Sequence, residues 1–236
     1  MNKMKRSLVS GTLVAILAAD AVNGASPQPI SPQRALTLVQ AFLYQDFVTM
    51  EGQEFTASAF GDAKKNAASQ LGVAGDPNLE AIRSAVQADF QAHSEEYWVR
   101  SHMAQARTVA SGDRSHVNWQ RTLWAIFTDD PRYVARILRA ISGSVPVNPV
   151  PEPALPLTVS KGVVQRVAPE LASSLKDRAK QTGCDSKPLT ALPAVAKEDP
   201  LLVLTVFEYF TSHDPADRTI ENALQALRTN GWTVTE

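Results

Sequence analysis

The chain has 236 residues and a formal net charge of −1 at pH 7, so charge gives no general attraction to nucleic acid or anionic lipid. Hydrophobic residues make up 44% of the chain and charged residues 20%, which is ordinary for a globular protein and argues against wholesale disorder. Cys184 is the only cysteine, so the chain cannot form an internal disulfide. We expect this thiol to be buried as a small apolar side chain, with exposure in a loop as the alternative.

The first 25 residues have the pattern of a secretory signal peptide. Three basic residues among the first six precede an uncharged apolar stretch over 7–19, and small residues follow. The apolar stretch is shorter than the roughly 20 residues needed to span a bilayer. We therefore expect export to the periplasm or the medium, cleavage between Ala21 and Ala25, and no transmembrane anchor afterwards. The alternative is a buried or membrane-lying N-terminal helix.

Several runs of periodic apolar residues begin with a capping residue followed by proline. Aspartate or serine at a helix N-cap accepts hydrogen bonds from free backbone N–H groups, and proline suits the first helical position. These dipeptides therefore predict helix starts. They are Ser31-Pro32, Asp76-Pro77, Asp130-Pro131, Asp199-Pro200 and Asp214-Pro215.

The predicted helices before residue 144 form an N-terminal bundle over 30–143. In the third of them, Leu79, Ile82, Val86 and Phe90 recur at three-to-four spacing, which places them on one buried face. Similar periodicity supports the other predicted helices, although glycine and small residues weaken the prediction of the second helix. The expected ranges are 32–50, 57–71, 77–93, 95–110, 115–127 and 131–141.

Residues 144–157 contain five prolines, which exclude a helix or a central strand. Such a segment favours an extended, semi-rigid spacer. We interpret it as a linker between two domains. The alternative is an ordered strap on one continuous domain.

The segment 158–236 is predicted to be a smaller, mostly helical C-terminal domain. We expect short strands over 157–159 and 162–164, helices over 169–182 and 219–230, and a short final strand from Trp232. Residues 201–210 have the composition of a buried strand, but their Asp199-Pro200 start favours a helix. The predicted fold class is therefore mainly α.

No catalytic or metal-binding motif stands out. The four histidines, His93, His102, His116 and His213, are not spaced three or four residues apart, so we expect no metal site and no cofactor. Glycosidases need two carboxylates across a cleft. Glu51, Glu54 and the pair Glu95-Glu96 are the acids that we considered for this role.

Arginines and tryptophans concentrate between residues 100 and 139. Arg100, Arg107, Arg114 and Arg121 are seven residues apart. On the following helix, three arginines share one face opposite the apolar residues, and we expect this face to be exposed and to bind an anionic partner. The candidate binding residues are Arg132, Arg136, Arg139, Arg121, Trp119 and Trp124. The alternative is that these arginines only solvate the outer faces of amphipathic helices.

The sequence therefore favours an exported, non-enzymatic binding or assembly protein of the cell envelope. Its expected partner is an unidentified protein or an anionic envelope component, and not nucleic acid. The alternatives are an exported hydrolase that acts on cell-wall or other polymer, and a secreted effector.

Overall fold

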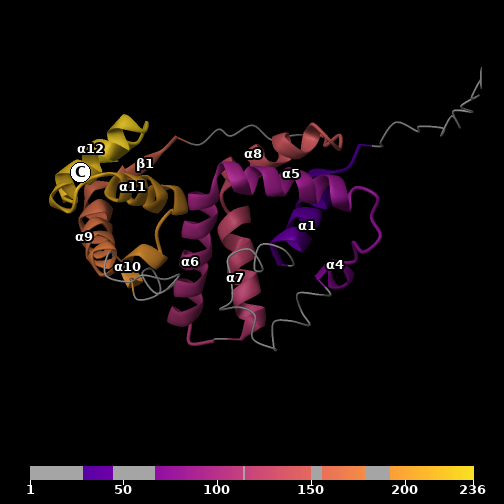
Figure 1. The fold of residues 1–236 in the computed structure, drawn as a ribbon, viewed down its shortest axis with the longest axis horizontal. Coiled ribbons are helices and arrows are strands. Elements are labelled where there is room, and N and C mark those ends of the chain that lie inside the picture. Colours follow the sequence, from indigo (N-terminus) through magenta and orange to yellow (C-terminus); the bar gives the residue numbers. More distant parts are fainter. Residues whose placement is uncertain (1–28, 45–66, 114, 150–155, 179–191) are drawn as a thin grey trace, which may run out of the picture.

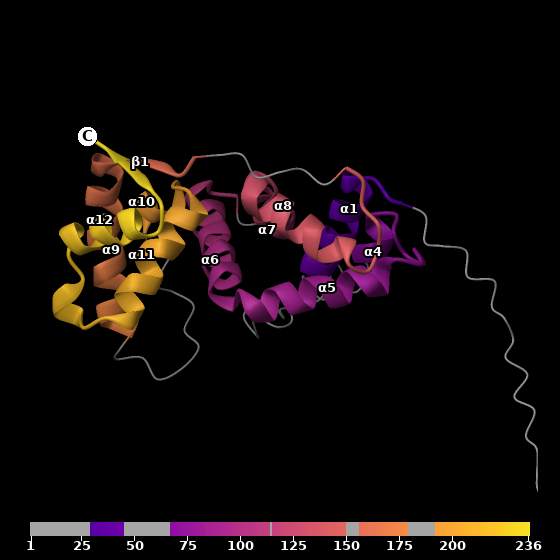
Figure 2. The same ribbon diagram turned by 90° about the horizontal axis from the view of Figure 1, so that it is seen from above.

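A computed structural model describes residues 29–44, 67–113, 115–149, 156–178 and 192–236. The chain is mainly α-helical, which confirms the predicted fold class, and its helices form an elongated arrangement (Figures 1 and 2). The predicted signal peptide over 1–25 and Cys184 lie outside the described residues. No helix in the described part of the chain combines the length and apolar character needed to cross a membrane.

The N-terminal unit consists of helices that pack around one apolar core. α5 lies against α1 and α8, while α6 and α7 form an antiparallel pair (Figure 1). Ile82 and Val86 of α5 are completely buried, as the predicted apolar face requires. The helices are α1 (Pro32–Phe42), α4 (Ala67–Gln70), α5 (Leu79–Ala92), α6 (Ser94–Ala110), α7 (His116–Thr128) and α8 (Pro131–Ser142).

Three of the five predicted helix starts are confirmed. Ser31, Asp130 and Asp199 occupy the N-caps of α1, α8 and α11 (Pro200–Ser212), and each side chain accepts a hydrogen bond from a backbone N–H of the first turn. In each case proline follows at the first helical position, where its lack of an N–H costs nothing.

The other two predicted starts are wrong. Asp76 accepts from the backbone N–H of Asn78 and closes a turn before α5. Asp214-Pro215 begins only the short 3-10 helix η3 (Pro215–Asp217). The cap of the next helix, α12 (Ile220–Thr229), is Thr219. Aspartate forms local turns as readily as caps, so the dipeptide alone does not distinguish the two outcomes.

The first part of the predicted linker lies against the N-terminal unit. Val145 and Val147 are buried, and the N–H of Ile30 donates to the carbonyl of Pro146. Residues 150–155 lie outside the described part of the chain. Whether the segment as a whole separates two domains stays a prediction.

The C-terminal unit contains further helices and one small parallel sheet. β1 (Thr158–Ser160) and β2 (Thr233–Thr235) pair in parallel, with Val159 opposite Val234, near the predicted strand positions. Residues 201–210 lie within α11, so the helical interpretation is confirmed. The remaining elements are α9 (Lys161–Arg178), α10 (Pro193–Ala196), α11, η3 and α12.

The predicted strand over 162–164 is wrong, because these residues belong to α9, which starts eight residues before the predicted helix. Val164, Val167, Ala168 and Leu171 are all buried at three-to-four spacing. This spacing places them on one face of a helix. Burial of that face outweighs the strand preference of adjacent valines.

The two units meet along α6. Helices α10 and α11 of the C-terminal unit pack against one side of α6, and α7 of the N-terminal unit packs against its opposite side (Figure 1). The ring of Trp98 on α6 stacks on Phe207 of α11 with a centroid distance of 5.1 Å. Buried residues from both units form one continuous apolar cluster.

Candidate functional site

The arginines predicted to form one exposed face on α8 do not do so. Arg136 donates to Asp89 at 3.1 Å and to Glu96 at 2.6 Å, and its side chain is 31% exposed. Arg132 is also paired within the molecule and is 21% exposed. The expectation of an open face is therefore wrong for these two residues. Carboxylates of α5 and α6 hold Arg136, whereas Asp130 and Asp199 hold Arg132.

The remaining candidate residues differ in their exposure. Arg139 and Arg121 are exposed, and neither forms an ion pair with another described residue. Trp119 is only 4% exposed and belongs to the core, and Trp124 packs against that core at partial burial. Trp119 is therefore a core residue, whereas a binding role for Arg139, Arg121 and Trp124 stays a prediction.

Arg100 of α6 is the centre of a buried ionic cluster. Its side chain is 1% exposed, and all three of its nitrogen atoms donate to oxygens of the protein. Nε contacts Glu96 at 2.8 Å, Nη1 contacts the carbonyl of Ile126 at 2.7 Å, and Nη2 contacts Asp130 at 2.6 Å. The guanidinium group therefore joins α6, α7 and the start of α8.

The second half of this cluster connects Arg136 to two tyrosines. Tyr97 donates to Asp89 at 2.8 Å and lies 3.2 Å from the hydroxyl of Tyr133. Arg100 and Arg136 both contact the ring of Tyr133, at 5.3 and 5.4 Å from its centroid. Burial raises the pKa of both tyrosines, so they remain neutral hydrogen-bonding groups at physiological pH.

The carboxylates of the cluster are held in their charged form. Burial alone would raise the pKa of Asp130, but hydrogen bonds from Arg132 and the charge of Arg100 outweigh it and lower the pKa to about 2. For Glu96, burial is likewise outweighed by Arg100 and Arg136, so the pKa lies below its ordinary value. These charges are neutralised internally, which suits a structural role.

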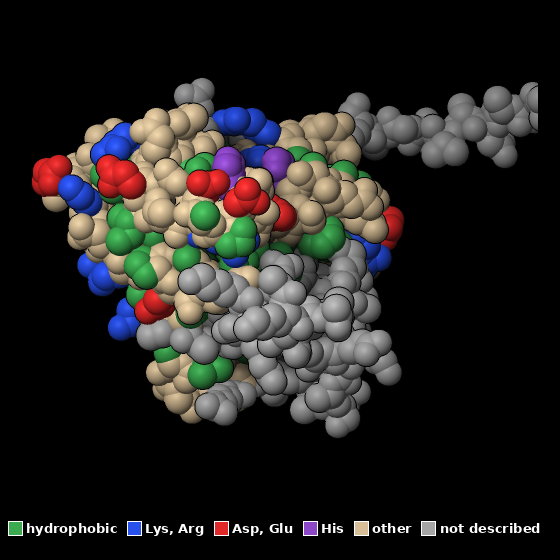
Figure 3. All heavy atoms as spheres, turned by 60° about the vertical axis from the view of Figure 1, so that its left-hand side comes forward, with side chains coloured by type: hydrophobic (Ala, Val, Ile, Leu, Met, Phe, Trp, Pro, Cys, Tyr) green, Lys and Arg blue, Asp and Glu red, His purple; other side chains and the backbone are tan. Residues whose placement is uncertain are grey.

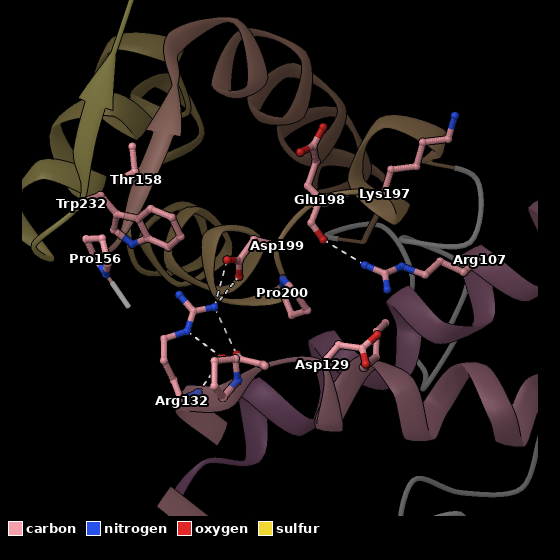
Figure 4. Close-up of a pocket in the computed structure, with 13 residues that line it drawn as sticks. Arg107, Asp129, Arg132, Pro156, Thr158, Lys197, Glu198, Asp199, Pro200 and Trp232 are labelled. Carbon is pink, nitrogen blue, oxygen red and sulfur yellow. Dashed lines mark hydrogen bonds and ion pairs between the residues drawn. The ribbon is translucent and has the colours of Figure 1, made fainter. Parts of the chain in front are cut away.

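A cavity of about 330 Å³ lies between the two units, and we call it the junction pocket (Figure 4). Its wall is mainly charged and comes from both sides of the junction. The N-terminal unit contributes the end of α6 and the turn before α8. The C-terminal unit contributes the residues before β1 and α11 and one tryptophan. The lining residues central to its chemistry are Arg107, Asp129, Asp130, Arg132, Thr158, Lys197, Glu198, Asp199 and Trp232.

Two helix starts meet at this pocket through one arginine. Asp130 caps α8, and Asp199 caps α11. Arg132 donates to Asp130 at 2.7 Å and to both carboxylate oxygens of Asp199 at 2.9 Å (Figure 4). Both contacts to Asp199 are made by Nη2, and they connect the two units directly.

Arg107 lies on the other side of the junction pocket. It donates to the carbonyl oxygens of Ala196 and Glu198, and it has no ion pair with a carboxylate among the described residues. Burial lowers the pKa of Arg107, and the nearby charges of Asp129 and Asp199 oppose this effect. Arg107 therefore brings a positive charge to the pocket wall that no carboxylate contacts directly.

Trp232 is the lining residue that the sequence did not single out. It is 5% exposed, and its Nε1 atom is buried without a hydrogen-bond partner among the described residues. It precedes β2 in a segment expected to be strand, and a single tryptophan at a strand start carries no signal of a binding site. Its importance follows only from its position beside the pocket.

A second, smaller hollow of about 200 Å³ lies where α5 and α6 meet. His93, Glu95, Glu96 and Glu208 line it, and Figure 3 shows carboxylates and histidines gathered on one face of the molecule. Burial raises the pKa of Glu208, and the charges of Glu95 and Glu96 add to this effect. Within the described ranges, no group of three or more His, Cys, Asp or Glu residues is arranged to hold a metal ion. Glu51 and Glu54 lie outside those ranges.

The described residues thus contain a closed ionic cluster, a charged junction pocket and an acidic hollow. Of these, the junction pocket has the larger volume and the more varied lining. Comparison of the chain with protein-family models, curated proteins and solved structures gave no match.

Proposed function

We propose that this chain is an exported, non-enzymatic binding protein of the cell envelope, and that the junction pocket is its binding site. The observation that carries the proposal is a cavity of about 330 Å³ lined by charged groups from both units. Ligand pockets typically have volumes of about 300–1,000 Å³ and occur preferentially where structural units meet. The pocket is therefore of a size that suits a small molecule.

The lining is held in place before any ligand arrives. Arg132 is fixed by Asp130 and Asp199, and Glu198 lies 3.3 Å from Arg166. A wall whose side chains are already ordered loses little conformational entropy on binding. Its cations, carboxylates, hydroxyl group and indole provide hydrogen bonds and charge, which supports binding more directly than nucleophilic catalysis.

Export rests on the signal-peptide pattern of residues 1–25. Its test is the intact mass of the protein recovered from the periplasm or the medium. We expect a chain that starts between residues 22 and 26. A full-length cytoplasmic product that begins at Met1 would contradict this part of the proposal.

The binding function is tested by capture of a small molecule. The mature protein is incubated with a protein-free extract of its own cell envelope, repurified and denatured, and released molecules are identified by mass spectrometry. Thr158→Phe should fill the pocket and abolish capture, since Thr158 lines it. Thr233→Phe is the matched control, because Thr233 pairs with Thr158 in the sheet but does not line the pocket.

The capture experiment has clear outcomes. A molecule retained by the wild type and by Thr233→Phe, but lost from Thr158→Phe, supports the proposal. No captured molecule, or equal capture by all three proteins, contradicts it. Circular dichroism of both variants establishes that each one is folded.

A hydrolase that acts on polymer is the second candidate, favoured by the acidic hollow. A glycosidase needs one protonated and one ionised carboxyl group, and Glu208 has a raised pKa beside Glu95. Both carboxylate oxygens of Glu96 already accept from arginines, which leaves Glu95 as the second acid. If this candidate is correct, the wild type and the exposed control Glu221→Gln release sugars from cell-wall glycan, and Glu208→Gln does not. Absence of release by the wild type rejects it.

A further inference from the structure

The ligand class of the junction pocket follows from its hydrogen-bond donors. An indole N–H can only donate, and most buried tryptophans find an acceptor. Only 5% of the surface of Trp232 is exposed, yet no residue in the described ranges accepts a hydrogen bond from its Nε1 atom. Figure 4 shows this nitrogen on the side of the ring that faces Pro156 and Arg132. The donor therefore lies on the side of the ring nearest Arg132, and no described residue accepts its hydrogen bond.

Arg132 supplies a second donor in the same part of the pocket. Its Nε and Nη2 atoms donate to Asp130 and Asp199, whereas Nη1 makes no hydrogen bond to a described residue. In Figure 4, the guanidinium nitrogen without a dashed line points toward Trp232. Two donors without acceptors thus face the same region from different units.

Building on the proposed function, we infer that the junction pocket binds a small molecule bearing a carboxylate or phosphate group. One oxygen of this oxyanion accepts from Trp232 Nε1–H and from Arg132 Nη1. Arginine binds both kinds of oxyanion, and a charge-assisted hydrogen bond is roughly twice as strong as a neutral one.

The lining carries three cations and four carboxylates, and three of these carboxylates, Asp130, Asp199 and Glu198, are already paired with arginines. The carboxylates of Asp130 and Asp199 are already held by the other two nitrogens of Arg132. Across the pocket, Arg107 donates only to carbonyl oxygens, and the exposed Lys197 forms no ion pair with a described residue. Asp129 is an exposed carboxylate on the same wall and opposes the anion, so the oxyanion is placed at the Trp232 side.

The test follows the indole N–H of Trp232 directly. The mature chain is labelled with ¹⁵N-tryptophan, and the indole signals of its four tryptophans are recorded by NMR during titration with succinate, inorganic phosphate or succinamide. Succinamide has the size of succinate without its charge. The Trp232 signal should move downfield with succinate, with phosphate or with both, and the two titrations distinguish the carboxylate from the phosphate source. Succinamide should leave it unchanged.

One variant tests the indole donor, and a second serves as its control. Trp232→Phe keeps an aromatic ring but removes the N–H, and we expect at least a tenfold weaker affinity for the oxyanion that binds. The matched control Trp124→Phe, at a tryptophan outside the pocket, should bind like the wild type. Trp232→Phe also removes buried volume, so we expect a moderately lower unfolding midpoint, and circular dichroism establishes that the variant is folded.

The inference is overturned if neither oxyanion shifts the Trp232 signal at millimolar concentration, or if Trp232→Phe binds as tightly as the wild type. If Trp232→Phe does not fold, the wild-type titration alone tests the inference. In that case each indole signal is assigned through the backbone resonances of its own residue. Capture of a neutral or cationic molecule in the extract experiment would overturn this inference and leave the proposed function intact.

Discussion

The cluster around Arg100 and the junction pocket around Arg132 use the same groups in different ways. Both place an arginine beside an aspartate that caps a helix, and both share Asp130. Arg100 is 1% exposed and all of its side-chain nitrogens donate, whereas Arg132 is 21% exposed and its Nη1 donates to no described residue. Complete satisfaction of hydrogen bonds marks a structural cluster, and incomplete satisfaction beside a cavity marks a candidate binding site.

The difference has an energetic consequence. Removal of one member from a buried cluster leaves an uncompensated charge away from water, which is strongly destabilising. At the junction, water and neighbouring charges reach the remaining groups. Mutations in the Arg100 cluster should therefore act on stability, and mutations at the junction should act mainly on binding.

The largest effect should come from Arg100→Met. This variant leaves the carboxylates of Glu96 and Asp130 buried with one arginine fewer, and we expect a loss of about 3–5 kcal/mol in the free energy of unfolding. The value is measured by urea denaturation. A loss below about 1 kcal/mol would mean that the cluster is solvated and that the comparison with the junction fails.

The second-largest effect should come from acid, which we expect to lower the free energy of unfolding by protonating the carboxylates of the cluster. The folded-state pKa of Asp130 is about 2, below its ordinary value of about 3.9. A lowered pKa contributes stability above the ordinary value that is lost as pH falls toward the folded-state value. We therefore expect the free energy of unfolding to fall between about pH 4 and pH 2, with Glu96 acting in the same direction.

Urea denaturation at several pH values measures this effect, and Asp130→Asn provides the comparison. The variant should be less stable than the wild type at neutral pH and should lose less stability on acidification. A wild-type stability that stays constant down to pH 2 would be inconsistent with a charged, paired Asp130.

A smaller effect is expected at the junction. Arg132 and Asp199 are 21% and 39% exposed, so their interaction is partly screened. A double-mutant cycle with Arg132→Gln and Asp199→Asn should give a coupling of about 1 kcal/mol, the upper end for exposed pairs. Coupling of 3 kcal/mol or more would place this pair in the same class as the Arg100 cluster.

The smallest effect should come from Arg139 and Arg121. Both are exposed without an ion-pair partner among the described residues, so Arg139→Gln and Arg121→Gln should each change the free energy of unfolding by no more than about 0.5 kcal/mol. Arg136→Gln on the same helix is the informative contrast, since it removes contacts to Asp89 and Glu96 and should cost more. Equal stabilities of Arg136→Gln and Arg139→Gln would contradict the assignment of Arg136 to the cluster.

Local signals in the sequence determined much of the secondary structure. Asp130 and Asp199 cap helices because an aspartate reaches the backbone N–H two residues later, a contact within one turn of the chain. The same reach lets Asp76 close a turn instead, which is why that prediction failed. Apolar spacing likewise identified the buried faces of α5 and α12, because burial follows helical periodicity.

Only the tertiary structure decided which arginines are structural and where the pocket lies. On α8, Arg132, Arg136 and Arg139 look equivalent in the sequence. Yet Arg136 pairs with carboxylates of α5 and α6, Arg132 pairs with Asp130 and with Asp199 before α11, and Arg139 pairs with no described residue. Trp232 and Arg132 come together across the junction although they are distant in the chain. Periodicity within a helix specifies which side of it is apolar, but the partner of a polar side chain depends on how separate helices pack, and no local pattern records that packing.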